Sequence, residues 1–488
     1  MAASFFFYDL ETTGFSARSG RIMQFAGQRT DMDLKPVGDP LNHLIKITPD
    51  VLPSPDAILV TGITPQQTLN EGMTEAEFLK IFYAEAVRSD TVFVGYNNVR
   101  FDDEFMRFLL YRNFYDAYEW AWKDGCSRWD LLDMVRMMRA LRPDGIEWPF
   151  SAEGKPANRL EFLSKANKLD HGKAHDALSD VQATIALARL VRSRQPDLFE
   201  YLLSMRDKKK AEALIRSGEP FVYTTGRYPS QYLHTSAAIF FAAHPQPGQT
   251  LVYDLRHDPT PFIDMSVEQL VEAWRFTKDP DTLRLPVKTV KYNRCPAVAP
   301  LGVMKDDSSQ ERIGLTLQTV ARNRALLQKH QQPFAKKVLQ AVARLDAKRE
   351  TEQTALIDNQ LTVDGRLYER FIDNADKAVL PEVRDASPER LSELAGSFRD
   401  ERLKNLIPLY KARNYPASLT SEERAAWDTF CARRLFEGGQ NSPLAKYFSR
   451  LEELAATELS GEQRYLLEEL QLYGQSIVPS DADGSGAG

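Results

Sequence analysis

The chain has 488 residues, which is too long for one ordinary core and indicates two to three domains. Apolar residues make up 43% and charged residues 27%, as in soluble globular proteins, and the net charge of -6 argues against a chain that coats nucleic acid indiscriminately. Cys126, Cys295 and Cys431 lie far apart and outside any Cys/His cluster, so neither a disulfide framework nor a zinc site is supported, and the cytoplasm is the expected compartment.

Residues 1–195 have the pattern of a mixed α/β domain. Short apolar segments at 5–10, 22–30 and 41–47 predict neighbouring strands, and TVFVGYN predicts another. Helical periodicity then follows at 74–88, 98–115, 129–140, 159–168 and 176–193. Strands first and helices interleaved afterwards are typical of an α/β fold.

The rest of the chain divides by composition. Residues 196–347 contain β-rich segments from 221 to about 300, which predict a small barrel or sheet with helical additions. Residues 348–475 are periodic as helices, and 476–488 form a polar, glycine-rich tail that we expect to be disordered. The longest apolar run, at 237–243, is far too short to span a bilayer, so we expect no membrane segment.

The segment FFFYDLETTGF, at 5–15, ends an apolar strand with two carboxylates. Side chains alternate along a strand, so Asp9 and Glu11 project to the same side. Two adjacent carboxylates repel one another unless a cation lies between them. The alternative is a pair of charges where the strand emerges into solvent.

A second acidic segment, GYNNVRFDDEF, turns from a strand into a helix. Asp102 shares its helical stripe with Phe105, Met106 and Leu109, whereas Asp103 lines up with Arg107 among others. Asp102 is therefore the expected buried ligand, and Asp103 the expected solvated neighbour.

The third segment is KAHDALSDVQATIALARLV. Asp176 has the character of an N-cap for a helix that continues to Val191, with Asp180 in its first turns. His175 would lie in the extended lead-in, which lets it and Asp180 reach one site. A lone histidine is more often a core or surface residue, so its role depends on the acids beside it.

Asp9, Glu11, Asp102, His175 and Asp180 together form a far more specific set than any part of it. Oxygen ligands suit Mg²⁺ or Mn²⁺. Two such ions can hold the attacking and leaving oxygens of a phosphoryl centre, and a neutral histidine can accept the proton of the attacking water.

The motifs DLETTG, NNVRFDDE and HDALSD resemble, in this order, those of the DEDDh 3′→5′ exonucleases, a family with a ribonuclease H-like fold. The histidine lies five residues before the last aspartate, whereas DEDDy relatives have a tyrosine where this chain has Asp176. TGITPQ, YRNFYD, SRWDLLD and ALRPDGI are also similar to bacterial exonuclease I enzymes, which degrade single-stranded DNA. Their layout of exonuclease, SH3-like and helical C-terminal domains extends the resemblance over nearly the whole chain.

The resemblance implies a mixed five-stranded sheet in the first domain and processive 3′→5′ hydrolysis of single-stranded DNA to 5′-mononucleotides, in DNA repair and recombination. It implies two Mg²⁺ ions, with Mn²⁺ as an alternative, held by Asp9, Glu11 and Asp180 and completed by Asp102. His175 would be the general base. The same resemblance places Glu11, Arg159, Arg107 and Arg136 beside the substrate, with solvated surface arginine as the alternative for the last two.

Two further groups are candidates for DNA contact. In YRNFYDAYEWAWK, Tyr118 and Trp122 are four residues apart, which predicts one helical face for base stacking, although aromatic residues at such spacings more often pack a core. In ILVTGITPQ, Thr61 and Gly62 offer small side chains and backbone amides at a turn, where a plain strand-to-helix turn is the alternative.

Exonuclease I relatives also bind the acidic tail of single-strand DNA-binding protein, and Arg142 and Tyr201 are candidates for that pocket by position. We expect a monomer. The alternatives are a related exoribonuclease and a non-catalytic single-strand-binding protein on the same fold.

Overall fold

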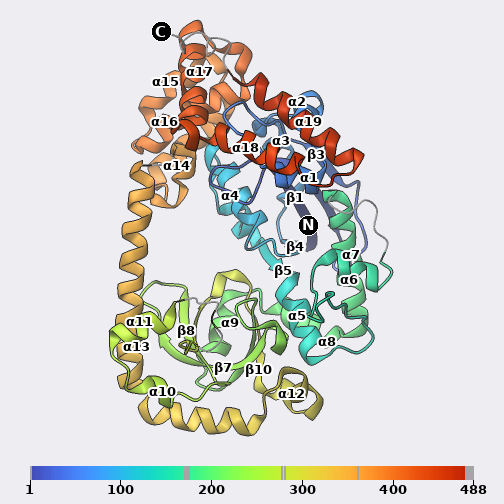
Figure 1. The fold of residues 1–488 in the computed structure, drawn as a ribbon, viewed down its shortest axis with the longest axis vertical. Coiled ribbons are helices and arrows are strands. Elements are labelled where there is room, and N and C mark those ends of the chain that lie inside the picture. The colour runs from blue at the N-terminus through green and yellow to red at the C-terminus, as the bar shows by residue number, and fades with distance from the viewer. Residues whose placement is uncertain (1–2, 170–175, 276–278, 280–281, 360–361, 479–488) are drawn as a thin grey trace.

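The computed structural model describes residues 3–169, 176–275, 279, 282–359 and 362–478. Figure 1 shows three parts in chain order: an α/β part, a β-rich part and a helical part. This order confirms the fold class expected from the sequence.

The first part is built on a mixed sheet. Its strands are β1 (Ser4–Thr12), β2 (Ile22–Thr30), β3 (Leu41–Leu44), β4 (Thr91–Gly95) and β5 (Ser127–Asp130), in the spatial order β3-β2-β1-β4-β5. β1 pairs antiparallel with β2 and parallel with β4, so β1 lies at the centre. The five-stranded sheet is as expected, but the residue pattern did not locate β5, because we began a helix at 129.

Helices cover both faces of this sheet. The helices of this part are α1 (Pro55–Thr61), α2 (Pro65–Glu71), α3 (Glu75–Ile81), α4 (Asp102–Arg112), α5 (Leu131–Leu141), α6 (Leu160–Ala166), α7 (Ala177–Arg194) and α8 (Pro196–Ser204). The next helix, α9 (Lys208–Ile215), packs instead into a core of the second part. Alternation along β1 sends Phe5 and Phe7 into a core shared with α5 and α7. Phe6 and Tyr8 enter the opposite core, which α3 and α4 cover.

The second part contains an antiparallel sheet. Its strands are β6 (Phe221–Thr224), β7 (Thr235–Ala243), β8 (Gln249–Asp254), β9 (Val287–Lys291) and β10 (Ala297–Pro300), in the order β10-β6-β7-β8-β9. The helices here are α10 (Thr260–Ile263), α11 (Val267–Trp274), α12 (Asp307–Ile313) and the long α13 (Leu317–Asn359). Figure 1 shows α13 running from the β-rich part to the helical part. The boundary that we expect at 347 lies inside this connecting helix.

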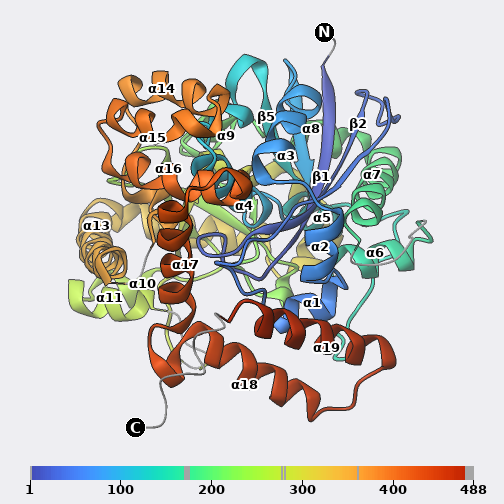
Figure 2. The ribbon, with the colours of Figure 1, turned by 90° about the horizontal axis from the view of Figure 1, so that it is seen from above.

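The third part contains α14 (Asn374–Asp385), α15 (Leu391–Leu394), α16 (Glu401–Asn414), α17 (Ser421–Phe436), α18 (Pro443–Ala455) and α19 (Gly461–Ser476). It packs against the first part at two places. Figure 2 shows α18 and α19 beside α1 and α2, where both parts share a core. A second shared core joins α4 to α14 and α16.

Within the described ranges, no helix is both long and apolar enough to cross a membrane. Most of the tail at 476–488 lies outside the described residues.

Candidate active site

The site lies where β1 ends and α7 begins. Asp9 and Glu11 continue the face of β1 on which Phe5 and Phe7 pack against α7, and both are partly buried. Asp180 is in the first turn of α7. The apolar half of this face fixes the strand against the helix, so the carboxylates are held at its open end.

Asp9, Glu11 and Asp180 converge as the sequence predicted. Each offers a carboxylate oxygen, and the three oxygens lie within 4.8 Å of one another. Burial, followed by the charges of Asp102 and Glu11, raises the pKa of Asp9 well above its usual range. Burial, followed by the charges of Asp180 and Asp102, raises the pKa of Glu11 to about 8. A divalent cation would relieve this repulsion, and the all-oxygen donor set fits one.

Asp102 lies close to this group at the N-terminus of α4 and is 4% exposed. Burial is the main cause that raises its pKa to about 8, and Asp103 adds to it. The structure therefore brings four of the predicted carboxylates together. His175 lies outside the described residues.

Asp103 corrects our expectation of a solvated neighbour, because it is fully buried. It accepts a hydrogen bond of 2.5 Å from the Tyr8 hydroxyl and forms an ion pair with Arg128. Helix periodicity misled here because α4 lies between the sheet and the third part, so both of its long faces pack against protein.

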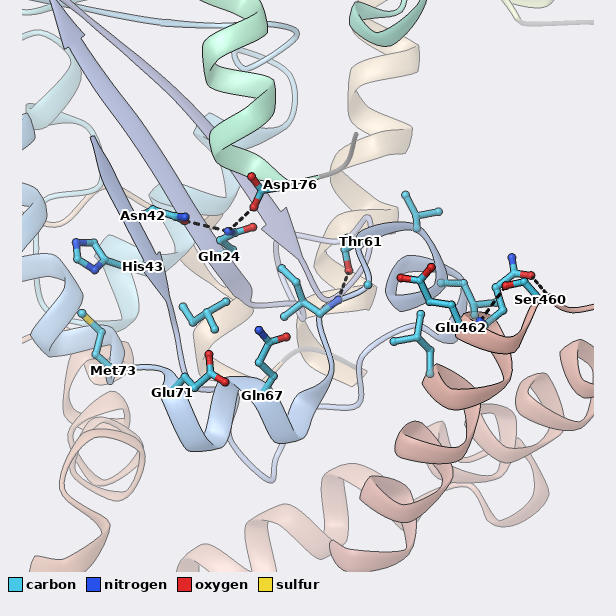
Figure 3. Close-up of a pocket in the computed structure, with 17 residues that line it drawn as sticks. Gln24, Asn42, His43, Thr61, Gln67, Glu71, Met73, Asp176, Ser460 and Glu462 are labelled. Carbon is cyan, nitrogen blue, oxygen red and sulfur yellow. Dashed lines mark hydrogen bonds between the residues drawn. The ribbon is translucent and has the colours of Figure 1, made fainter. Parts of the chain in front are cut away.

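Asp176 is the N-cap of α7, as predicted, and its side chain accepts a hydrogen bond of 3.1 Å from the Ser179 amide. Figure 3 shows a further contact, because Gln24 of β2 reaches both Asp176 and Asn42. Sequence reasoning missed Gln24. The available signal was a glutamine within the otherwise apolar start of β2, IMQFA.

Thr61 and Gly62 line a pocket of about 890 Å³ beside this contact. Figure 3 shows that β2, β3, the α1–α2 connection and α19 surround it. Thr61 ends α1 and Gly62 is its left-handed cap with φ 72°, so this segment is helical where we considered a strand. Nothing lies within 4 Å of the place that a Cβ would take at Gly62. Its amide, however, donates to the Ile58 carbonyl at 2.8 Å, so this amide is not free as expected.

Tyr118 and Trp122 do not share an α-helical face, which corrects the prediction. A 3₁₀ turn at Glu119–Ala121 separates them, and Tyr118 has non-helical dihedral angles. They nonetheless line one pocket together with Phe371 of the third part. Trp122 is 62% exposed, while the Tyr118 ring lies 5.7 Å from the Phe371 ring and 5.6 Å from the Arg107 guanidinium.

The predicted arginines differ in their surroundings. Arg107 is mostly buried and pairs with Glu104 at 2.6 Å, and Arg136 pairs with Asp133 at 2.6 Å, so neither is a solvated surface arginine. Arg159, directly before α6, has an exposed side chain at 3.6 Å from Glu161.

The two candidates for protein binding belong to two helices that pack together, Arg142 at the end of α5 and Tyr201 on α8. Arg142 directly follows α5, and its guanidinium lies 3.3 Å from the Asp306 carboxylate. Tyr201 of α8 is half-buried against two cores.

Comparison with known proteins matches each part of the chain to a family model. Residues 6–188 match the model described as "Exonuclease", residues 206–344 the "Exonuclease I SH3-like domain" and residues 361–477 the "Exonuclease I C-terminal domain". Exodeoxyribonuclease I of Escherichia coli is 39% identical and covers 87% of this chain and 88% of its own. That of Haemophilus influenzae is 38% identical over 88% of this chain and 90% of its own.

Solved structures agree over 98% of the chain. Exonuclease I from Methylocaldum szegediense is 41% identical with a TM-score of 0.89, and the match covers 100% of that chain. The Escherichia coli enzyme in complex with a dA16 oligonucleotide is 35% identical with a TM-score of 0.89, again over 100% of that chain. The resemblance stated from the motifs is thereby confirmed.

Proposed function

The chain belongs to the exonuclease I family of nucleases, and we propose that it hydrolyses single-stranded DNA processively from the 3′ end and releases 5′-mononucleotides. The observation that carries this proposal is the convergence of Asp9, Glu11 and Asp180 within 4.8 Å. The matched enzyme that was solved with a dA16 oligonucleotide supports the choice of substrate. We also propose that this activity acts in DNA repair and recombination.

We assign the metal site to four carboxylates. Asp9, Glu11 and Asp180 would hold two Mg²⁺ ions, or Mn²⁺ ions, and Asp102 would complete the set. When bound, the ions supply positive charge for the attacking and leaving oxygens of the phosphodiester. A relative has been solved as "the zinc ion bound form", which supports a divalent cation but not Mg²⁺ in particular. His175 would accept the proton of the attacking water.

For the substrate, exposed Trp122 and the Tyr118–Phe371 pair offer aromatic surfaces on which bases of any sequence could stack. Arg107, Arg136 and the exposed Arg159 would contact phosphates, while Thr61, Gly62 and Glu11 would approach the terminal nucleotide. Arg107 would act through a guanidinium that Glu104 already orients.

For a protein partner, we propose the acidic tail of single-strand DNA-binding protein, with Arg142 and Tyr201 in its pocket. A relative was solved as "SSB/Exonuclease I", which supports this partner. The unpaired thiols Cys126, Cys295 and Cys431 fit the cytoplasm. A monomer, and domain boundaries at 195 and 347, stay predictions.

The test is digestion of matched 5′-labelled DNA and RNA strands with Mg²⁺ or with EDTA. We expect a ladder from the 3′ end of DNA in Mg²⁺ alone, and its loss in Asp180→Ala and His175→Ala. Asp39→Ala, which changes an exposed acid, is the control. Undiminished digestion in EDTA or by Asp180→Ala would contradict the metal site, preferred digestion of RNA would favour the exoribonuclease, and binding without digestion would favour the non-catalytic alternative.

A further inference from the structure

Gln24 lies directly opposite Glu11 in the antiparallel pair of β1 and β2. It is 6% exposed, so its amide is almost removed from water. Burying an amide is unfavourable unless its polar atoms are bonded. Its partners therefore indicate what the side chain does.

Within the described residues, the polar partners of Gln24 connect β2 to β3 and to the start of α7, beside the proposed metal site. Its Nε2 donates to Asn42 Oδ1 at 2.9 Å and to Asp176 Oδ1 at 3.0 Å, and its Oε1 accepts from the Ala177 amide at 3.3 Å. The orientation of the amide follows from chemistry, because a backbone N–H can only donate and an ionised carboxylate can only accept. Figure 3 shows the Gln24 side chain between Asn42 and Asp176.

This contact holds the first turn of α7. The Ala177 amide is one of the N-terminal donors that a helix cannot satisfy itself, and Asp176 is the N-cap. The Asp180 amide donates to the Asp176 carbonyl at 3.0 Å. A short chain of bonds thus runs from the β1–β2 ladder at Glu11, through Gln24 and Asp176, to the turn that carries Asp180.

We propose that Gln24 is a positioning residue that sets the separation of the Glu11 and Asp180 carboxylates and thereby the affinity for the divalent cation. The proposal rests on the proposed function, because it assigns the metal to these two ligands. Gln24 itself touches no reacting atom. An apolar residue could fill the same space, but it would leave the Asp176 carboxylate and the Ala177 amide without this partner.

The experiment exchanges donor and acceptor. Gln24→Glu places a carboxylate against Asp176 and removes the donor. Asp176→Asn removes the acceptor, but its amide oxygen can still accept from the Ser179 amide and cap α7. In the double variant the new amide at position 176 can donate to the new carboxylate at position 24, so the bond returns in the opposite direction with the original number of charges. Asn42 can turn its amide to donate as well.

We measure Mn²⁺ affinity by titration calorimetry, and kcat and KM on a single-stranded oligonucleotide. Removing a partner that orients a metal ligand lowers metal affinity or activity by about 10- to 100-fold. We therefore expect each single variant to lose about tenfold or more in Mn²⁺ affinity and in kcat. KM for DNA should stay unchanged, and the double variant should recover most of both losses.

Gln28→Glu is the matched control. Gln28 is also a buried glutamine of β2, 7% exposed, but it lies opposite Phe7 and donates to backbone carbonyls, including that of Arg29 at 2.9 Å. We expect Gln28→Glu to lower the melting temperature but to leave the Mn²⁺ affinity and kcat of the folded protein unchanged. Combining Gln28→Glu with Asp176→Asn should not recover the Mn²⁺ affinity that Asp176→Asn loses.

Two results would overturn the proposal. One is a Gln24→Glu protein that loses stability but binds Mn²⁺ as the unchanged protein does. The other is a double variant whose fold-loss in Mn²⁺ affinity equals or exceeds the product of the fold-losses of the two single variants. Mn²⁺ binding requires no turnover, so the calorimetric measurement tests the role of Gln24 even if the unchanged protein fails to degrade DNA. Such a failure would count against the proposed function and not against the role of Gln24.

Discussion

Arg21 and Asp364 join the first and third parts of the molecule through a buried ion pair of 2.9 Å between Arg21 Nη2 and Asp364 Oδ2. Arg413 and Asp50 extend the cluster, since Arg413 Nη2 lies 2.8 Å from a carboxylate oxygen of both Asp364 and Asp50. Arg21 also exchanges hydrogen bonds with Thr13, just after the β1 carboxylates, through its backbone amide and carbonyl. The third part thus supports the turn that follows Asp9 and Glu11.

Asp364→Asn should therefore destabilise the protein strongly. The charge of Asp364 is completely buried, and although burial alone would raise its pKa, Arg413 and Arg21 hold that pKa well below its usual range. Removing one partner of such a cluster leaves buried arginines uncompensated, which costs about 3–5 kcal/mol. Urea unfolding monitored by circular dichroism measures the loss in the free energy of unfolding.

Asp56→Asn is the matched control, because Asp56 also joins the first and third parts through an ion pair, with Arg450 at 2.7 Å. Both side chains are more than 40% exposed, so we expect a loss of about 0–1 kcal/mol. Equal losses for Asp364→Asn and Asp56→Asn would contradict the role that we give to burial.

The metal-free protein should lose stability as the pH rises. Burial raises the pKa of Glu11 and of Asp102 to about 8 in the folded chain, against about 4 in the unfolded chain. Between these values the folded state holds more protons than the unfolded state, so the free energy of unfolding falls with rising pH. A cation bound to the ionised carboxylates removes this penalty. In EDTA we expect a melting temperature several degrees lower near pH 9 than near pH 6, and a smaller difference in Mg²⁺.

Asp9→Asn tests the cause of this pH dependence, because it removes one of the repelling charges and leaves the side chain nearly the same size. Its melting temperature in EDTA should depend less on pH and should respond less to Mg²⁺. A pH dependence that is identical with and without Mg²⁺ would show that the carboxylates do not bind the cation.

The sequence predicted the positions of Asp9, Glu11 and Asp180 because each position depends on a local rule. Alternation along a strand places Asp9 and Glu11 on one side, and the N-cap Asp176 fixes the start of the helix that carries Asp180. The order of strands and helices gave the α/β domain for the same reason. These patterns are contained within short segments of the chain.

The remaining features depend on contacts between distant segments. Asp103 is buried because Tyr8 of β1 and Arg128 of β5 contact it, which the periodicity of its own helix does not reveal. Trp122 leaves the helical pattern because a 3₁₀ turn follows Tyr118, whose ring instead packs against Phe371 of the third part. Tertiary packing determined both outcomes.

Trp122→Ala should weaken the binding of single-stranded DNA with little change in stability. Its side chain is 62% exposed, so it contributes little to the core, whereas stacking of a base on an aromatic ring is worth about 1–3 kcal/mol. We expect KM for an oligonucleotide to rise about 5- to 150-fold at an unchanged melting temperature. Tyr465→Ala, which removes a 55% exposed aromatic residue from α19, is the control. Equal KM values for the two variants would exclude stacking on Trp122.

Arg142 and Asp306 give opposite predictions for binding of an acidic peptide. Arg142→Glu should weaken binding by about tenfold or more, since a hydrogen bond to a charged group is worth about 1.5–3 kcal/mol. Asp306 lies 3.3 Å from Arg142 and competes with an incoming carboxylate. Asp306→Asn removes that charge while its side chain can still accept from the Ser309 amide and cap α12, so this variant should bind the peptide more tightly.

Fluorescence anisotropy with a labelled acidic peptide measures both effects, and degradation of free oligonucleotides should stay unchanged. If both variants bind the peptide as the unchanged protein does, the acidic tail binds elsewhere, because two opposite changes of charge at one site cannot both be neutral to a charged ligand bound there.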